Sequence, residues 1–93
     1  MSDPIEVRHA LPLEEALARL RALAHEHDVA LEAEEGGRSG SIEKSMGWLG
    51  KVRGRFRIET ERVEVAIESA PTMVGEATVR RFLAEALEQA FGA

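Results

Sequence analysis

The sequence predicts an α+β domain: a curved antiparallel sheet of four to five strands with two amphipathic helices on one face, in the order β-α-β-(β)-β-β-α. Two observations support this fold class. Apolar residues recur at helical spacing in residues 13–28 and again from residue 79 onward, whereas they alternate with polar residues in the segments before and between. The alternating segments are close enough in sequence to be joined by tight turns, which favours antiparallel pairing.

Length and composition indicate one small domain spanning residues 1–93. A chain of 93 residues fits one core and leaves no room for a second. Its 44% hydrophobic and 31% charged residues are typical of a globular domain rather than of a disordered chain. The absence of cysteine excludes disulfides and thiolate metal sites.

The chain contains no apolar run near the roughly 20 residues that span a bilayer. Met1–Pro4 do not resemble the start of a signal peptide. We therefore expect no transmembrane segment and a cytoplasmic location. The net charge of -5 disfavours attraction of the whole molecule to nucleic acid.

Residues 5–11 predict a first, half-buried strand, because their apolar and polar side chains alternate. The side chains on its apolar face are Ile5, Val7, His9 and Leu11. Pro12 ends this strand and suits the first turn of a helix, where its missing N–H would have no partner. From Leu13 the spacing becomes helical, and this helix is expected to end near Asp28. Its apolar stripe consists of Leu13, Ala16, Leu17, Leu20, Leu23, Ala24 and His27.

Residues 29–33 alternate again and predict a second strand, followed by a hairpin loop over residues 35–40. Residues 41–46 are less regular, because Lys44 lies on the same face as two apolar side chains, Ile42 and Met46. We interpret them as a short edge strand. An inward lysine there would discourage pairing with a second sheet.

The clearest strand pair is formed by residues 51–58 and 63–69, because a single register satisfies both faces of this hairpin. Its apolar pairs are Ile58 with Val63, Phe56 with Val65 and Gly54 with Ile67. Its charged pairs are Arg57 with Glu64 and Arg53 with Glu68. The apolar residues, together with Val52, are expected to point inward and to receive Leu17, Leu20, Phe82 and Leu83.

A second helix is predicted after Pro71, with Thr72 or Gly75 as its cap. Its apolar residues continue at helical spacing. They are Val79, Phe82, Leu83, Ala86, Leu87, Ala90 and Phe91.

No group of residues predicts catalysis, a cofactor or a metal, so we do not expect an enzyme. Ser41–Lys44 match the Ser-x-x-Lys pattern of acylating hydrolases, but the segment is strand-like and the partner motifs are missing. His25 and His27 are two residues apart on a helix and point in different directions, which disfavours a shared metal ion. His9 is expected to be a half-buried histidine with its hydrogen bonds satisfied. The glycine-rich loop, residues 36–41, could form an anion-binding nest, but a plain hairpin turn is favoured.

Four cations alternate along one predicted strand: Lys51, Arg53, Arg55 and Arg57. Such a row could follow a phosphate backbone, which makes it the best indication of nucleic-acid binding in the sequence. The predicted register places Glu64 and Glu68 beside the row, and no stacking aromatic shares its face. A solvated sheet surface is therefore the favoured interpretation.

Trp48 and Leu49 lie in a turn between two glycines, Gly47 and Gly50. An aromatic residue on a turn can anchor a partner or line the mouth of a groove. It can equally fold back over the end of the core, and we favour that second interpretation. Trp48 and Leu49, with the four cations of the basic strand, form the candidate interaction surface.

The chain as a whole resembles a family of small bacterial proteins, the polyhydroxyalkanoic acid system proteins. The resemblance is carried by an opening strand that runs into Leu11–Ala16, by a glycine-punctuated sheet with Gly54–Ile58 and Val63–Val65, and by a closing helix with Val79–Leu83. It spans nearly the whole chain. It implies a role in polyhydroxyalkanoate synthesis or at polyhydroxyalkanoate granules, and it carries over no catalytic or binding residue.

We therefore expect a small non-enzymatic accessory or binding protein, acting at polyester granules or with their enzymes. An apolar groove between the helices and the sheet would suit an acyl chain or a partner helix. The expected partner is a protein, a hydrophobic ligand or a polymer surface, and a homodimer stays open. The alternative, less favoured, is a nucleic-acid-binding module that uses the basic strand Lys51 to Arg57.

Overall fold

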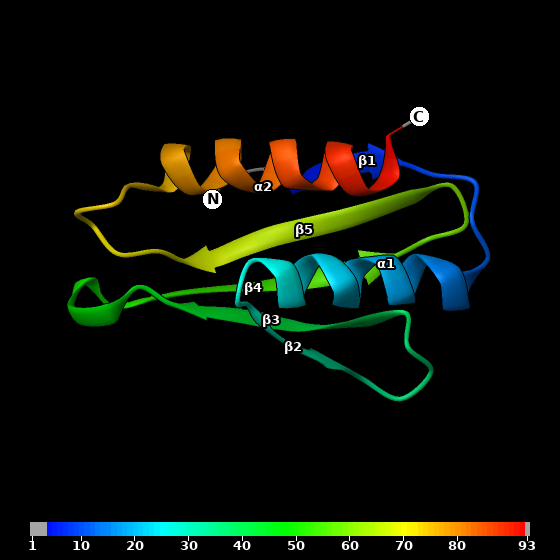
Figure 1. Ribbon diagram of the computed structural model, residues 1–93, viewed down its shortest axis with the longest axis horizontal. Coiled ribbons are helices and arrows are strands. Elements are labelled where there is room, and N and C mark those ends of the chain that lie inside the picture. Colours follow the sequence, from blue (N-terminus) through cyan, green and yellow to red (C-terminus); the bar gives the residue numbers. More distant parts are fainter. Residues whose placement is uncertain (1–3, 93) are drawn as a thin grey trace.

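The computed structural model describes residues 4–92, which form a five-stranded antiparallel sheet with two helices on one face (Figure 1). The elements are β1 (Ile5–Arg8), α1 (Leu13–Glu26), β2 (Ala30–Ala33), β3 (Ser39–Ser45), the 3-10 turn η1 (Gly47–Leu49), β4 (Lys51–Ile58), β5 (Arg62–Ser69) and α2 (Glu76–Phe91). The predicted fold class and element order are confirmed. The expectation drawn from the first residues, Met1–Asp3, lies outside the described part of the chain.

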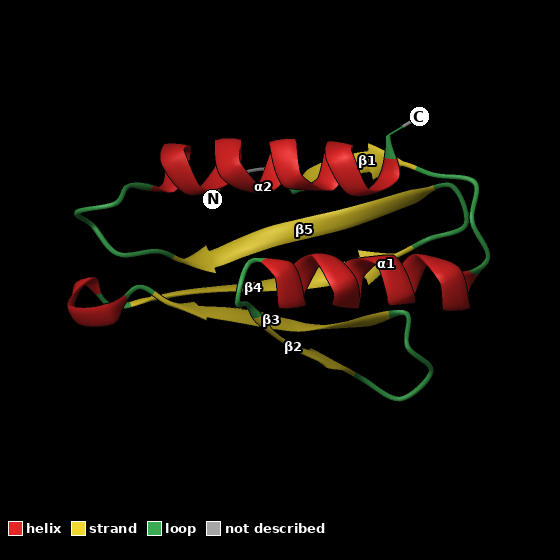
Figure 2. Cartoon of the chain, viewed as in Figure 1, coloured by secondary structure: helices red, strands yellow, loops and turns green. Residues whose placement is uncertain are grey.

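The strand order is β1-β5-β4-β3-β2, so that β2 to β5 form a consecutive meander and β1 joins at the free edge of β5 (Figure 2). All neighbouring strands are antiparallel. The helices run in opposite directions across one face (Figure 1). Neither helix within residues 4–92 has the length and apolar character needed to cross a membrane.

The β4–β5 hairpin positions the core. Side chains of β4 alternate strictly between exposed and buried, and Phe56 and Ile58 pair with Val65 and Val63 as predicted. The predicted pairing of Arg53 with Glu68 is wrong, because a register shift between Arg53 and Gly54 places Arg53 opposite Ser69. Glu68 is the extra residue of a bulge in β5 and leaves the ladder there.

β3 differs most from the prediction. It is a seven-residue strand that lies between β2 and β4, and so it is not an edge strand. It begins at Ser39, so the loop before it is shorter than expected. Gly40 lies opposite Phe56, and a Cβ atom on Gly40 would come within 2.7 Å of the phenyl ring. Glycine is therefore needed where the ring packs over the strand.

α1 and α2 close the core over the inner face of the sheet. Leu20 of α1 and Leu87 of α2 are buried against Phe56, Val63 and Val65. Leu17 and Leu83 are half-buried against the same cluster. Phe82 was expected in the core, but it is 40% exposed, because it lies at the edge of the apolar stripe of α2.

α1 ends earlier than predicted, at Glu26, with His27 as its C-terminal cap residue. Asp28 then adopts a left-handed backbone conformation with a φ of 58°, which turns the chain toward β2. The Val29 N–H donates to the carbonyl oxygen of Ala24 at 2.7 Å, which closes the last turn. The early end of α1 leaves part of the sheet without a covering helix.

Candidate functional site

An apolar cavity lies between the first half of α2 and the ends of β3 and β4 that lead to η1. Its volume is about 230 Å³. The cavity forms because β4 continues past the end of α1. The 14 residues of α1 span about 21 Å, whereas the 8 residues of β4 span about 26 Å. The residues that line it are Val29, Ile42, Glu43, Lys44, Met46, Val52, Val74, Thr78, Val79, Phe82 and Leu83.

The wall of this cavity is apolar even where a lysine contributes to it. Lys44 points to the inner face of β3, and its Nζ donates a hydrogen bond of 2.6 Å to the carbonyl oxygen of His27. That oxygen is one of the unpaired carbonyls at the end of α1, where a cation is favoured. Lys44 therefore lines the cavity with its methylene stem and stabilises the helix end with its ammonium group.

A second, smaller cavity of about 40 Å³ lies next to the first, between α1, α2 and the sheet. The two cavities share four lining residues: Val29, Ile42, Phe82 and Leu83. These side chains form a partition between them. The ring of Phe82 is positioned by an edge-on contact with His27, with 5.0 Å between ring centroids and an interplanar angle of 88°.

Exposed apolar side chains border the larger cavity. Trp48 on η1 is 85% exposed, and Met73, next to the lining residue Val74, is 76% exposed. Their loops lie at the same end of the sheet (Figure 1), where a Cβ on Gly50 would contact Pro71. The expectation that Trp48 folds back over the core is wrong, because the indole projects from the turn. Leu49 beside it is half-buried.

The basic strand lies on the opposite face of the sheet, away from the cavity. All four of its cations are exposed, as their alternation predicted. Two of them are paired with carboxylates: Lys51 with Glu43 of β3 at 3.0 Å, and Arg55 with Glu34 in the turn after β2. Hydrogen bonds from these cations lower the pKa of both carboxyl groups. The six residues of the candidate interaction surface are thus divided between the η1 turn and the charged sheet face.

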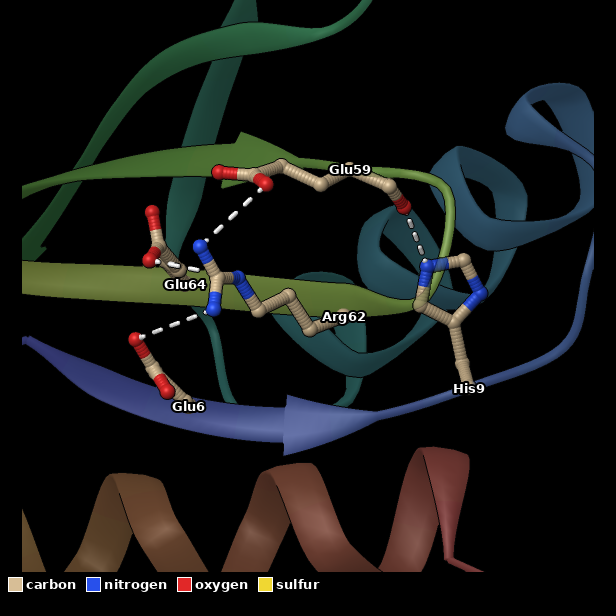
Figure 3. Close-up of polar contacts among 5 residues, drawn as sticks. All are labelled: Glu6, His9, Glu59, Arg62 and Glu64. Carbon is tan, nitrogen blue, oxygen red and sulfur yellow. Dashed lines mark hydrogen bonds and ion pairs between the residues drawn. The ribbon is translucent and has the colours of Figure 1, made fainter.

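A carboxylate cluster surrounds Arg62 where β1 meets β5 (Figure 3). Arg62 forms ion pairs with Glu6 at 4.0 Å, Glu59 at 3.4 Å and Glu64 at 3.5 Å. The pKa of Glu64 is nevertheless raised. The largest cause is a hydrogen bond with the carboxyl group of Glu6, followed by partial burial and by the negative charge of Glu59. Together these effects exceed the opposing effect of the positive charge on Arg62. The cluster is a solvated network at the sheet surface.

His9 is a structural residue, as predicted. The Leu11 N–H donates to its Nδ1 at 3.1 Å, so Nε2 carries the hydrogen and donates to the carbonyl oxygen of Glu59 at 2.7 Å (Figure 3). The His9 ring also lies 5.9 Å from that of Phe91. These contacts connect the end of β1 to the β4–β5 turn and to α2.

His25 is exposed, whereas His27 is half-buried against Phe82. Within residues 4–92 no cluster of three or more histidine, aspartate or glutamate side chains could bind a metal ion.

Sequence reasoning identified the glycine-flanked turn at the end of the cavity but missed most of the lining residues. Met46, Val74 and Val79 come from three separate segments of the chain, and no local motif connects them. The available signal was a difference in the distance spanned, because the extended strand at residues 51–58 reaches further than the first helix although it has fewer residues.

Comparisons with known proteins leave the family of this chain open. No protein-family model matches the chain, and neither the curated proteins nor the solved structures include a significant match. The geometry of the site is therefore the basis for the function proposed below.

Proposed function

We propose that this chain is a small non-enzymatic binding protein that takes an alkyl or acyl chain into the apolar cavity between α2 and the ends of β3 and β4. The cavity of about 230 Å³ carries this proposal. It exceeds the roughly 150 Å³ of an engineered apolar cavity that stays dry and binds benzene. It is smaller than the roughly 300 to 1,000 Å³ of sites for drug-sized ligands. Its size and apolar wall suit a short hydrocarbon chain.

The proposal is tested by measuring the binding of methyl octanoate, an uncharged acyl ester. Binding to the folded state raises the melting temperature in proportion to the logarithm of the ligand concentration. Thr78 lines the cavity at an exposed position of α2, so Thr78→Phe should fill the cavity and abolish the shift. Ala77→Phe is the matched control, because Ala77 is exposed on the same turn and does not line the cavity.

A wild-type chain that shows no shift with methyl octanoate would overturn the proposal. Equal binding by the wild type and Thr78→Phe would also overturn it, because the ligand would then occupy another place. Loss of binding in Thr78→Phe alone supports the cavity as the site.

The resemblance to the polyhydroxyalkanoic acid system proteins supplies a biological setting for this proposal. In that setting the chain contacts a polyester or its enzymes. The contact is made by the exposed Trp48 and the neighbouring Leu49, on the turn that follows the lining residue Met46. Co-sedimentation with polyhydroxyalkanoate particles should fall severalfold on Trp48→Ser. Equal sedimentation of wild type and variant argues against contact through this turn.

The alternative function, nucleic-acid binding by the basic strand, has weaker support. Lys51 and Arg55 are paired with carboxylates, and Glu64 lies opposite Arg57 in the sheet. These neighbours reduce the positive potential that a phosphate backbone would meet.

A further inference from the structure

The partition between the two apolar cavities has a consequence for the ligand. Four residues line both cavities: Val29, Ile42, Phe82 and Leu83. A chain that fills the larger cavity therefore ends against these side chains. Beyond them lies a space of about 40 Å³, whose other walls include Leu20, Phe56, Val65 and Leu87 of the core. A ligand in the larger cavity extends into that space only if a side chain of the partition moves or is shortened.

Phe82 is the most exposed member of the partition. It is 40% exposed, whereas Leu83 is half-buried against the main cluster. Its ring is instead positioned by the edge-on contact with His27 at the end of α1. Phe82 can therefore be changed at less cost to the fold than a fully buried residue.

We infer that Phe82 determines the chain length of the acyl ligand by separating the larger cavity from the smaller one beside it. This inference rests on the proposed function, since it concerns the same site. The occupant is a linear, uncharged hydrocarbon chain, because the walls on both sides of the partition are apolar. Each further methylene that enters an apolar site tightens binding by roughly fourfold, and the gain stops when the chain reaches the partition.

The experiment measures dissociation constants by calorimetry for a series of linear methyl esters, from methyl butanoate to methyl dodecanoate. In the wild type, affinity should rise with chain length and then reach a plateau. In Phe82→Ala the plateau should move to chains longer by about two carbons, because the opened space adds the volume of one to two water-sized groups. Phe82→Trp should move the plateau toward shorter chains.

Met73→Ala is the matched control, because Met73 is an exposed apolar side chain that lines neither cavity. It should leave the plateau unchanged. The chain-length profile separates a specificity role from a structural one, because a variant that only loosens the fold weakens binding of all the esters without moving the plateau. Melting temperatures of the ligand-free variants show that each is folded.

The possible failures can be told apart. If the wild type binds none of the esters, both the proposed function and this inference are overturned. If the wild type binds them with a plateau that stays the same in Phe82→Ala and Phe82→Trp, the binding function stands and the role of Phe82 is overturned. Opposite shifts of the plateau in the two variants support the inference.

Discussion

Gly40 illustrates at the scale of one residue how a missing side chain positions the core. A Cβ atom there would lie 2.1 Å from the carbonyl oxygen of Glu32 and 2.7 Å from the ring of Phe56. Gly40→Ala should therefore lower the free energy of unfolding by about 1 to 3 kcal/mol, because strand and ring must both move. Chemical denaturation measures this loss.

Ser41→Ala provides the control for the Gly40 substitution. Ser41 is the next residue of β3, and its side chain lies on the other face of the sheet. Its replacement should change the stability by less than about 0.5 kcal/mol. A Gly40→Ala protein as stable as Ser41→Ala would contradict the packing of Phe56 over β3.

The carboxyl groups on the sheet predict a pH dependence of mixed sign. A raised pKa means that Glu64 stabilises the fold when it is protonated. Its contribution to the free energy of unfolding is present below the ordinary pKa of 4.5 and is lost as the pH rises through its folded-state pKa. Glu34 and Glu43, with lowered pKa values, contribute above the ordinary value and lose that contribution as the pH falls through their folded-state values. Carbon-13 NMR of the carboxyl groups should show Glu64 titrating above Glu34 and Glu43.

Two substitutions test the origin of the raised pKa of Glu64. Glu64→Gln should have a higher melting temperature than the wild type at neutral pH, with a difference that shrinks as the pH falls through the folded-state pKa of Glu64 toward 4.5. Glu6→Gln removes the carboxyl group that shares the hydrogen bond and should lower the pKa of Glu64. An unchanged titration of Glu64 in Glu6→Gln would refute the shared hydrogen bond.

Single residues also mark where sequence reasoning fails. Lys44 interrupts an apolar alternation, and the pattern gave no sign that its ammonium group binds the carbonyl oxygen of His27, 17 positions earlier in the chain. Trp48 was correctly placed in a turn, but a turn does not reveal which way an indole points. Both errors concern contacts with distant parts of the chain, which periodicity does not encode.

At the scale of elements, the basic strand β4 makes a clear prediction. Because two of its four cations are paired with Glu34 and Glu43, the wild type should not bind oligonucleotides measurably at physiological ionic strength. The double substitution Glu34→Gln with Glu43→Gln should increase binding at low salt severalfold. Fluorescence anisotropy of a labelled oligonucleotide measures both.

The opposite result would restore the alternative function. Tight, salt-sensitive binding by the wild type that Arg55→Glu abolishes would establish the basic strand as a nucleic-acid interface. The same Arg55→Glu substitution should leave the binding of methyl octanoate unchanged, because Arg55 does not line the apolar cavity.

The elements differ in how well the sequence predicted them. The β4–β5 register was predictable because apolar and charged pairs independently agree on it, until the bulge at Glu68, which has no sequence signature of its own. β3 was predicted poorly, because Gly40 and Lys44 replace apolar residues on its inner face. The cavity was predictable only as a groove between helices and sheet, because its exact walls depend on where α1 ends.

At the scale of the whole molecule, the large exposed apolar residues among residues 4–92 are Trp48, Met73 and Phe82. Phe82 lines the larger cavity, and the other two lie in loops that also contribute the lining residues Met46 and Val74. The charged strand face lies on the other side of the sheet. The molecule therefore presents an apolar end and a charged face in different directions, which a ligand or partner can distinguish.

Trp48 reports on the apolar end, because it is the only tryptophan of the chain. With 85% of its surface exposed, its fluorescence should be quenched by acrylamide nearly as strongly as that of a free indole. Unfolding in denaturant should change this quenching little. Strong protection of Trp48 in the native protein, released on unfolding, would contradict the exposed position of η1.

The contact between β1 and α2 joins segments from opposite ends of the sequence. During translation, β2 to β5 can pair in succession as each strand leaves the ribosome, since neighbours in the chain are neighbours in the sheet. β1 must wait for β5, and the buried face of Ile5 becomes fully covered only after residues 76–91 have emerged. A nascent chain stalled before α2 would thus carry an assembled meander whose apolar face is covered by α1 alone, and such exposed apolar surface is what chaperones and proteases recognise.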